Sequence, residues 1–236
     1  MKQLLMSEKE KEIMRKLEKA ARMLSPETIP VSVNVLPAAW MHYGEDLVKI
    51  AKEYPQFFSE IPDLDKVKDM LDPRYQKGQW TDEWGCVWSN IMEGNDAYVT
   101  GHPLQSKEGI MNLEIPGNRD GNLPHGFFYL RLLDLCGFEF AMELFAEEPE
   151  ELQVLIDKVV TYNCYQIEVF VKEHLKHQDH LYIFGDDNGM QHGLPIGPER
   201  WRKYIKPAYQ KMYHMVSKLF SKSSHGYHTV PLKTYN

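Results

Sequence analysis

The sequence has few cysteines and no long apolar segment. Its three cysteines, Cys86, Cys136 and Cys164, lie far apart and form no C-x-x-C pair. An odd number of scattered cysteines argues against a disulfide framework and favours a reducing compartment. The chain also has no run of about 18 consecutive apolar residues and no secretory signal segment. We therefore predict a cytoplasmic protein with no membrane span.

The sequence also lacks an excess of positive charge. Lys and Arg number 27 against 34 Asp and Glu, which leaves a net charge of −7. Such a chain repels nucleic acids and anionic membranes. Glycine-rich nucleotide loops, the G-x-S-x-G motif of serine hydrolases and the H-E-x-x-H zinc motif are absent as well. A small molecule or another protein is therefore the expected partner.

Helical and strand patterns alternate along a chain that is 43% hydrophobic, enough for one substantial core. Helical periodicity predicts helices at residues 7–24, 45–54, 138–146, 150–175 and 198–220. Pro207 is expected to kink or split the last of them. Short β-branched and aromatic runs predict strands at residues 29–36, 97–99, 127–135 and 181–184. This alternation indicates a parallel α/β arrangement.

The turn after the strand expected at residues 181–184 carries two adjacent acidic residues, Asp186 and Asp187. In βα folds, the loops at the carboxyl ends of the strands build the active site. A carboxylate there can act as a general acid or base, or can hold a cationic group of a substrate. The alternative is that both carboxylates only cap the loop and the next helix.

A second candidate site is the aromatic-rich segment at residues 80–88, which we expect to form a strand pair near a pocket rim. Asp82, Glu83 and Trp84 place two carboxylates beside an indole ring. Carboxylates and indole faces together suit a flat or cationic ligand. The alternative is that the tryptophans belong to the core.

Two further side chains are candidates for substrate binding. His102 follows an expected strand, which would place it at the rim of the substrate pocket. The alternative is that it only forms a hydrogen bond within its loop. Arg131 lies inside an apolar run and needs a partner if it is buried. We expect its partner to be either a carboxylate of the substrate or, in a structural ion pair, the carboxylate of Asp134, Asp186 or Glu83.

Several segments, taken together, resemble uroporphyrinogen decarboxylase-like proteins. They are DEWGCVW at residues 82–88, HPL at 102–104, the block at 137–163 and the segment from FGDDNGMQ to PERWRKYIKPAY at 184–209. Within that superfamily they are most similar to the branch related to corrinoid and coenzyme M methyltransferases. The likeness covers roughly residues 30–215.

The resemblance implies a (β/α)8 TIM barrel with its active site at the C-terminal ends of the strands. We expect residues 1–28 to form a helical extension and residues 29–236 an incomplete, C-terminally truncated barrel. The implied chemistry is methyl transfer between a methyl donor, a corrinoid and a thiol. The alternatives are decarboxylation of the acetate arms of a tetrapyrrole, as in porphyrin biosynthesis, or an inactive fragment. Asp186, Asp187 and Gln191 carry over as pocket residues.

Two departures from the family pattern bear on cofactors and partners. The decarboxylases hold propionates with an arginine-rich segment, whereas residues 33–46 here contain no arginine. The methyltransferases bind zinc through a His-x-Cys pair and a later Cys, but no cysteine follows Cys164. We therefore predict no metal site, and a corrinoid protein is a candidate partner. An incomplete barrel also exposes strand edges, which predicts self-association.

A cluster of metal-ligand residue types does not change that prediction. It consists of His174, His177, Asp179 and His180. The cluster lies at the end of the helix expected at residues 150–175, where histidines interact well with the helix C-terminus, so we interpret it as a solvated helix end.

Overall fold

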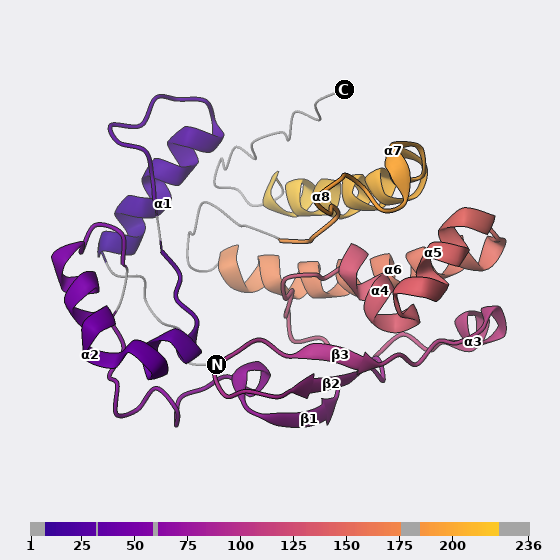
Figure 1. The fold of residues 1–236 in the computed structure, drawn as a ribbon. Coiled ribbons are helices and arrows are strands. Elements are labelled where there is room, and N and C mark those ends of the chain that lie inside the picture. The colour runs from indigo at the N-terminus through magenta and orange to yellow at the C-terminus, as the bar shows by residue number, and fades with distance from the viewer. Residues whose placement is uncertain (1–7, 32, 59–60, 176–184, 222–236) are drawn as a thin grey trace. The chain divides into compact units, whose positions relative to one another are not determined.

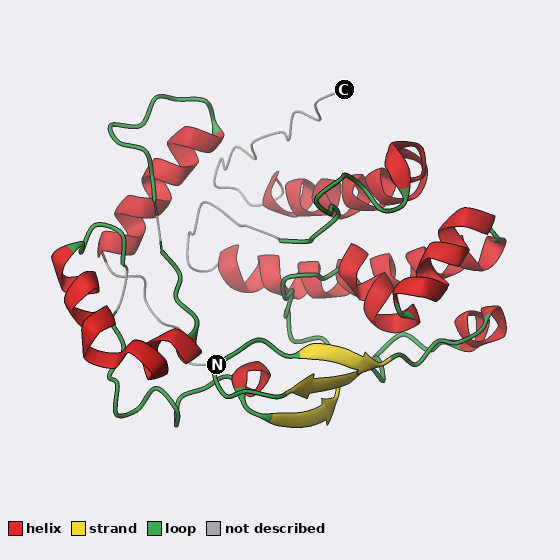
Figure 2. Ribbon diagram, viewed as in Figure 1, coloured by secondary structure: helices red, strands yellow, loops and turns green. Residues whose placement is uncertain are grey.

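The computed structural model describes residues 8–31, 33–58, 61–175 and 185–221 (Figure 1). Its elements in chain order are α1 (Glu8–Ala21), α2 (Pro37–Glu53), η1 (Pro73–Tyr75), β1 (Gly78–Thr81), β2 (Val87–Asn90), β3 (Tyr98–Gly101), α3 (Lys107–Asn112), α4 (Tyr129–Cys136), α5 (Phe138–Glu147), α6 (Glu150–Leu175), α7 (Gly197–Arg200), η2 (Trp201–Ile205) and α8 (Lys206–Ser221). Helices predominate over strands in these residues, as Figure 2 shows.

The fold is not a (β/α)8 TIM barrel, and the prediction of a parallel sheet is wrong. The described residues contain one sheet of three strands, hydrogen-bonded in the order β1-β2-β3. A barrel needs parallel strands joined by long crossovers, whereas strands joined by short turns pair antiparallel. The turn between β1 and β2 spans only Asp82 to Cys86 and includes Gly85 at a φ of +86°. The segment at residues 80–88 does contribute to a strand pair, as predicted. Because a short turn joins the two strands, the pair is an antiparallel hairpin and not part of a parallel sheet.

Two other strand predictions, for residues 29–36 and 127–135, are also wrong. Instead of the strand expected at residues 127–135, Tyr129–Cys136 form helix α4, with Leu132 and Leu135 buried on one face. Residues 33–36 are irregular, and Val33 donates its N–H to the carbonyl oxygen of Phe57 at 2.8 Å. The strand expected at residues 181–184 lies outside the described residues.

The predicted helices are largely confirmed. Helices α5 and α6 match the patterns at residues 138–146 and 150–175. The helix expected from residue 45 is the second part of α2, because Gly44 interrupts that helix at a φ of +48°. Before Pro207 the chain makes a π-helical turn, η2, in which the N–H of Lys206 bonds to the carbonyl of Trp201. Pro207 has no amide hydrogen and so makes no helical bond of its own, but residues 197–221 remain helical without a break, and the change near Pro207 is a π-helical turn and not a split into two helices.

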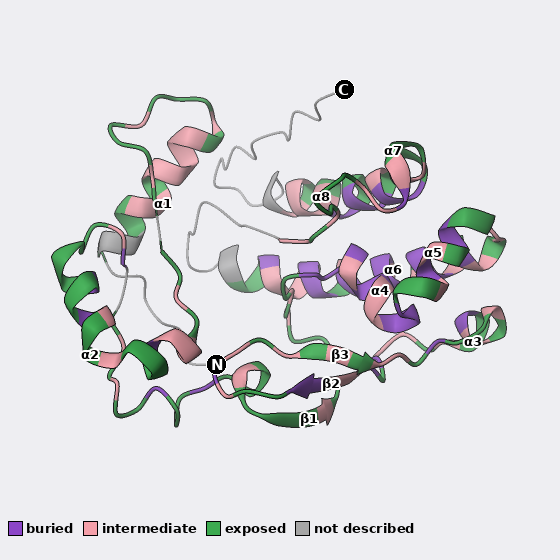
Figure 3. Cartoon of the chain, in the orientation of Figure 1, coloured by how far each residue is buried: buried purple, intermediate pink, exposed green. Residues whose placement is uncertain are grey.

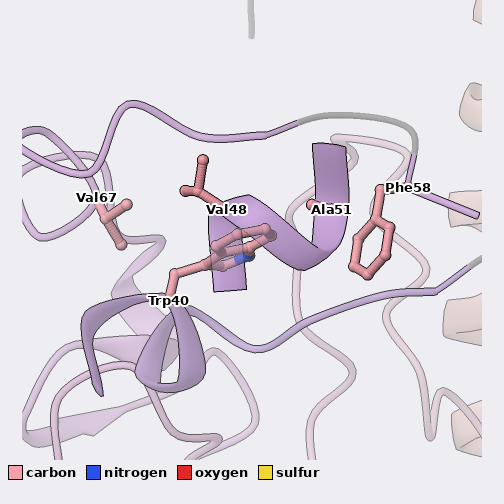
Figure 4. Close-up of a cluster of buried hydrophobic side chains, with 5 residues drawn as sticks. All are labelled: Trp40, Val48, Ala51, Phe58 and Val67. Carbon is pink, nitrogen blue, oxygen red and sulfur yellow. The ribbon is translucent and has the colours of Figure 1, made fainter. Parts of the chain in front are cut away.

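The chain forms two compact units. The first comprises the described residues up to Trp80 together with Trp88–Tyr98. Its core contains Trp40, Val48, Ala51, Phe58 and Val67 (Figure 4). Trp40 and Phe58 meet edge to face, with 6.5 Å between ring centroids. The boundary expected after residue 28 stays a prediction.

The second unit comprises Thr81–Val87 and the described residues from Val99 onward. Helix α6 is its centre and packs against α8, α3 and α4. Buried positions recur along α6, as Figure 3 shows, and include Leu152, Leu155, Val159 and Ile167. Each such side chain contributes roughly 1.5–3 kcal/mol when it leaves water. Across the described ranges, no helix is both long and apolar enough to cross a membrane.

Candidate functional site

A buried ion pair joins the β1–β2 turn to α4. The Arg131 side chain is only 10% exposed, and its Nη1 lies 2.5 Å from Oδ2 of Asp82. Oδ1 of Asp82 accepts the backbone N–H groups of Trp84 at 3.0 Å and Cys86 at 2.9 Å. Asp82 therefore holds the turn and neutralises Arg131 at the same time. Arg131 is thus held in a structural ion pair, as one of the two alternatives predicted, but its nearest carboxylate is that of Asp82, which was not among the partners expected for it.

A second carboxylate, Asp134, lies on the next turn of α4. Its Oδ2 is 4.0 Å from Nη1 of Arg131. Burial raises the pKa of Asp134 to about 6, although the Arg131 charge acts in the opposite direction. Asp82, Arg131 and Asp134 thus form one charged network, in which Asp134 titrates at mildly acidic pH.

His102 connects this network to the surface. Its Nδ1 lies 2.8 Å from the carbonyl oxygen of Asp134. A carbonyl oxygen only accepts hydrogen bonds, so Nδ1 must carry the proton. In the neutral ring, Nε2 then has a free lone pair, and Nε2 makes no hydrogen bond to any described residue. His102 can therefore accept a hydrogen bond from a ligand.

A shallow hollow of about 470 Å³ opens beside this imidazole, and we call it the His102 hollow. Its lining consists of His102, Gln105, Cys136, Gly137, Phe138, Glu139, Phe140 and Glu143. Gly137 has a φ of +75°, and a Cβ on it would lie 3.1 Å from Cδ2 of His102. Only glycine lets the ring lie this close to the backbone without strain.

The chemistry of the His102 hollow is acidic and aromatic. Glu139 and Glu143 are exposed and lie one turn apart on α5. Cys136 is unsuited to nucleophilic attack, because burial raises the pKa of its thiol to about 12. The hollow thus offers two carboxylates, an imidazole lone pair and the rings of Phe138 and Phe140, and no Lys or Arg is among its lining residues.

Glu83 and Trp84, both predicted to bind substrate, face α6 instead. Trp84 is 4% exposed and meets the ring of Tyr162 edge to face at 5.0 Å. The Tyr162 hydroxyl donates to Oε1 of Glu83 at 3.0 Å. Burial, and then the Glu83 charge, raise the pKa of Tyr162 to about 12, so the hydroxyl remains a donor. Both residues anchor the turn to the core in this structure.

Asp186 is occupied by hydrogen bonds at the N-terminus of α4. Its carboxylate accepts the N–H groups of Phe128 at 3.2 Å, Tyr129 at 2.5 Å and Leu130 at 3.1 Å. It also accepts the hydroxyl of Tyr209 at 2.6 Å. Asp186 therefore caps a helix, which was the alternative to a catalytic role. The capped helix is α4, however, and not the helix that begins near residue 198.

The other residues of that loop are more exposed. Oδ1 of Asp187 lies 3.6 Å from Nε2 of His125, and both side chains are more than half exposed. Gln191 is exposed as well. Neither aspartate lines the His102 hollow. Their predicted catalytic role stays a prediction.

The structure therefore connects three of the predicted site residues, Asp82, Arg131 and His102, through Asp134. Sequence reasoning missed Glu139 and Glu143 as lining residues. A helical interpretation of residues 127–135 would have placed Asp134 one turn from Arg131 and so favoured it over Asp186 and Glu83 among the expected partners.

No three His, Cys, Asp or Glu side chains come together as a metal site within the part of the chain that the structure describes. The described residues thus do not fit the zinc of the methyltransferases. The histidine-rich cluster after residue 173 falls outside the side chains that the structure describes.

Comparisons with known proteins identify no relative of this chain. No family model matches it, and neither a search of curated proteins nor one of solved structures returns a similar protein.

Proposed function

We propose that the protein binds a small organic cation in the His102 hollow. The observation that carries this proposal is the imidazole of His102, whose Nδ1–H is held by the Asp134 carbonyl at 2.8 Å. Its Nε2 is thereby left as an acceptor, and Glu139 and Glu143 line the same hollow. An ammonium group donates hydrogen bonds to such acceptors, and aromatic rings attract cations.

The charge of the hollow also favours one of the chemistries that the family resemblance implies. Two carboxylates repel the acetate and propionate arms of a tetrapyrrole. A cationic methyl donor, such as a methylated ammonium compound, would instead be attracted by them. The finer proposal is therefore a methyltransferase-like rather than a decarboxylase-like protein, with a corrinoid protein as a candidate partner. The predicted self-association stays a prediction.

The proposal is tested with benzylammonium, which combines a cation with a ring. We expect saturable binding that perturbs the NMR signals of the His102 ring. His102→Asn preserves a donor to the Asp134 carbonyl but removes Nε2, and we expect it to weaken binding about tenfold. The double variant Glu139→Gln with Glu143→Gln is expected to weaken it by a similar factor.

Asp157→Asn is the matched control, since Asp157 is an exposed carboxylate on α6 that does not line the hollow. It should leave the affinity unchanged. Benzyl alcohol, which has the ring without the charge, should bind more weakly than benzylammonium, and uroporphyrin should not quench the tryptophans. Equal affinity of wild type and the Glu139/Glu143 double variant would overturn the proposal.

A further inference from the structure

A second hollow, of about 330 Å³, lies in the same unit between α5 and the segment that leads into α7, and it shares only Phe138 with the lining of the His102 hollow. Its walls are apolar and include Met142, Phe145, Met190 and Ile196. Arg200 supplies the guanidinium of this lining, and we call the cavity the Arg200 hollow. It therefore differs from the His102 hollow in the sign of its charge.

The charge of Arg200 is only partly balanced. Its Nε lies 3.2 Å from Oε1 of Glu148. The same carboxylate also pairs with Nζ of Lys203 and accepts the hydroxyl of Tyr204 at 3.1 Å. Two cations thus share one carboxylate, which leaves one positive charge in excess.

The terminal nitrogens of Arg200 are available to a ligand. None of its three nitrogens forms a hydrogen bond to another described residue: Nε lies 3.2 Å from Glu148 as an ion pair but is buried without a hydrogen-bond partner. The planar guanidinium matches the geometry of a carboxylate, which it can bind through two parallel hydrogen bonds. An anion here would complete the neutralisation that Glu148 begins.

We propose that the Arg200 hollow binds a small carboxylate with an apolar body. The carboxylate pairs with the Nη groups of Arg200, and the body packs against Phe145 and Met190. Ligand pockets usually measure about 300–1,000 Å³, so this hollow is at the lower end of that range. It suits a ligand with a single ring or a short branched chain and not a tetrapyrrole or a corrinoid. Met142 and Met190 have flexible side chains that adapt to such a ligand.

The test uses phenylacetate as the probe, with methyl-labelled methionines and NMR detection. We expect saturable shifts of the Met142 and Met190 methyl signals. Phenylacetamide, which lacks the charge, should bind at least about tenfold more weakly. Arg200→Gln should weaken phenylacetate binding by a similar factor, and Ala146→Phe, which fills the hollow from an exposed position of α5, should abolish it.

Arg202→Gln is the matched control, because Arg202 is exposed two positions along the chain and does not line the hollow. It should leave the affinity unchanged. Thermal unfolding of each variant checks that the fold is retained. Equal affinities for phenylacetate and phenylacetamide, or no effect of Arg200→Gln in a folded variant, would show that no carboxylate site exists. Benzylammonium should not shift the Met142 and Met190 signals, so this result is separate from the test of the His102 hollow.

Discussion

The carboxylate of Asp186 accepts the backbone N–H of Tyr129 at 2.5 Å, although 57 positions separate the two residues. Every helix leaves the N–H groups of its first turn without partners inside the helix, and a negative charge there is favourable. Phe128, the residue before α4, supplies no such cap from its side chain. Asp186 supplies it, and its bond to Tyr209 also joins α8 to the same point.

Replacing Asp186 should therefore destabilise the second unit. Asp186→Asn removes the charge and one acceptor oxygen, and we expect the free energy of unfolding to fall by about 2 kcal/mol. Asp187→Asn, at an exposed position, should change it by no more than about 0.5 kcal/mol. Guanidinium chloride titrations followed by circular dichroism measure both values. If the two variants are equally stable, the carboxylate does not cap α4.

The pair of Asp82 and Arg131 should behave as a coupled unit. Asp82→Ala leaves a buried guanidinium without its partner, which costs about 3–5 kcal/mol. Arg131→Met together with Asp82→Ala removes both charges and should cost less than the sum of the single substitutions. A double-mutant cycle measured by chemical denaturation gives the coupling energy. Strict additivity would mean that the two side chains do not interact.

Asp134 should make stability depend on pH below neutrality. Its pKa of about 6 in the folded protein lies above the ordinary 3.8, so between these values the folded protein binds a proton that the unfolded chain does not. Its contribution to the free energy of unfolding is therefore largest below about pH 4 and is lost as the pH rises through about 6. The total change is no more than about 3 kcal/mol.

Asp134→Asn isolates this contribution, because asparagine does not titrate. Relative to the variant, wild type should gain stability as the pH falls from about 7.5 to about 4.5. Denaturant titrations at several pH values measure the difference. The exposed Asp157→Asn serves as the control and should show little change. A constant difference between wild type and Asp134→Asn across this range would contradict the raised pKa.

Lys158 on α6 should stabilise the end of α3. Its Nζ donates to the carbonyl oxygens of Ile110, Met111 and Leu113 at 2.9, 2.8 and 2.7 Å. Lys158→Met keeps the length of the side chain but removes these bonds, so we expect a loss of about 1–3 kcal/mol. Hydrogen exchange at α3 should accelerate in the variant. Unchanged protection of Ile110 would contradict this account.

Helix α4 shows where sequence reasoning failed. The run FFYLRLLDL at residues 127–135 is apolar enough to suit either a strand or a buried helix. Nothing local decides between them, since the cap of the helix comes from Asp186. Asp134 was one of the partners expected for Arg131, but its link to His102 through the backbone carbonyl was not predicted.

The sheet was misjudged for a related reason. Short β-rich segments between helices suggest parallel strands, but the pairing of strands depends on how the chain turns between them. Asp82 and Gly85 make the turn of a hairpin, and this brings β1 and β2 together as antiparallel neighbours. Residues 80–88 were correctly predicted as a strand pair because that signal is local.

By itself, the sequence determined the helices α5 and α6, the irregular turn before Pro207 and the net negative charge. Periodicity, the missing amide hydrogen of proline and ionisable side chains are properties of short segments, so they can be read without a fold. Only the tertiary structure decided that residues 129–136 are helical, that Arg131 pairs with Asp82, and that His102 lines the same hollow as Glu139 and Glu143. These features depend on groups that are distant in sequence and become neighbours only when the core excludes water.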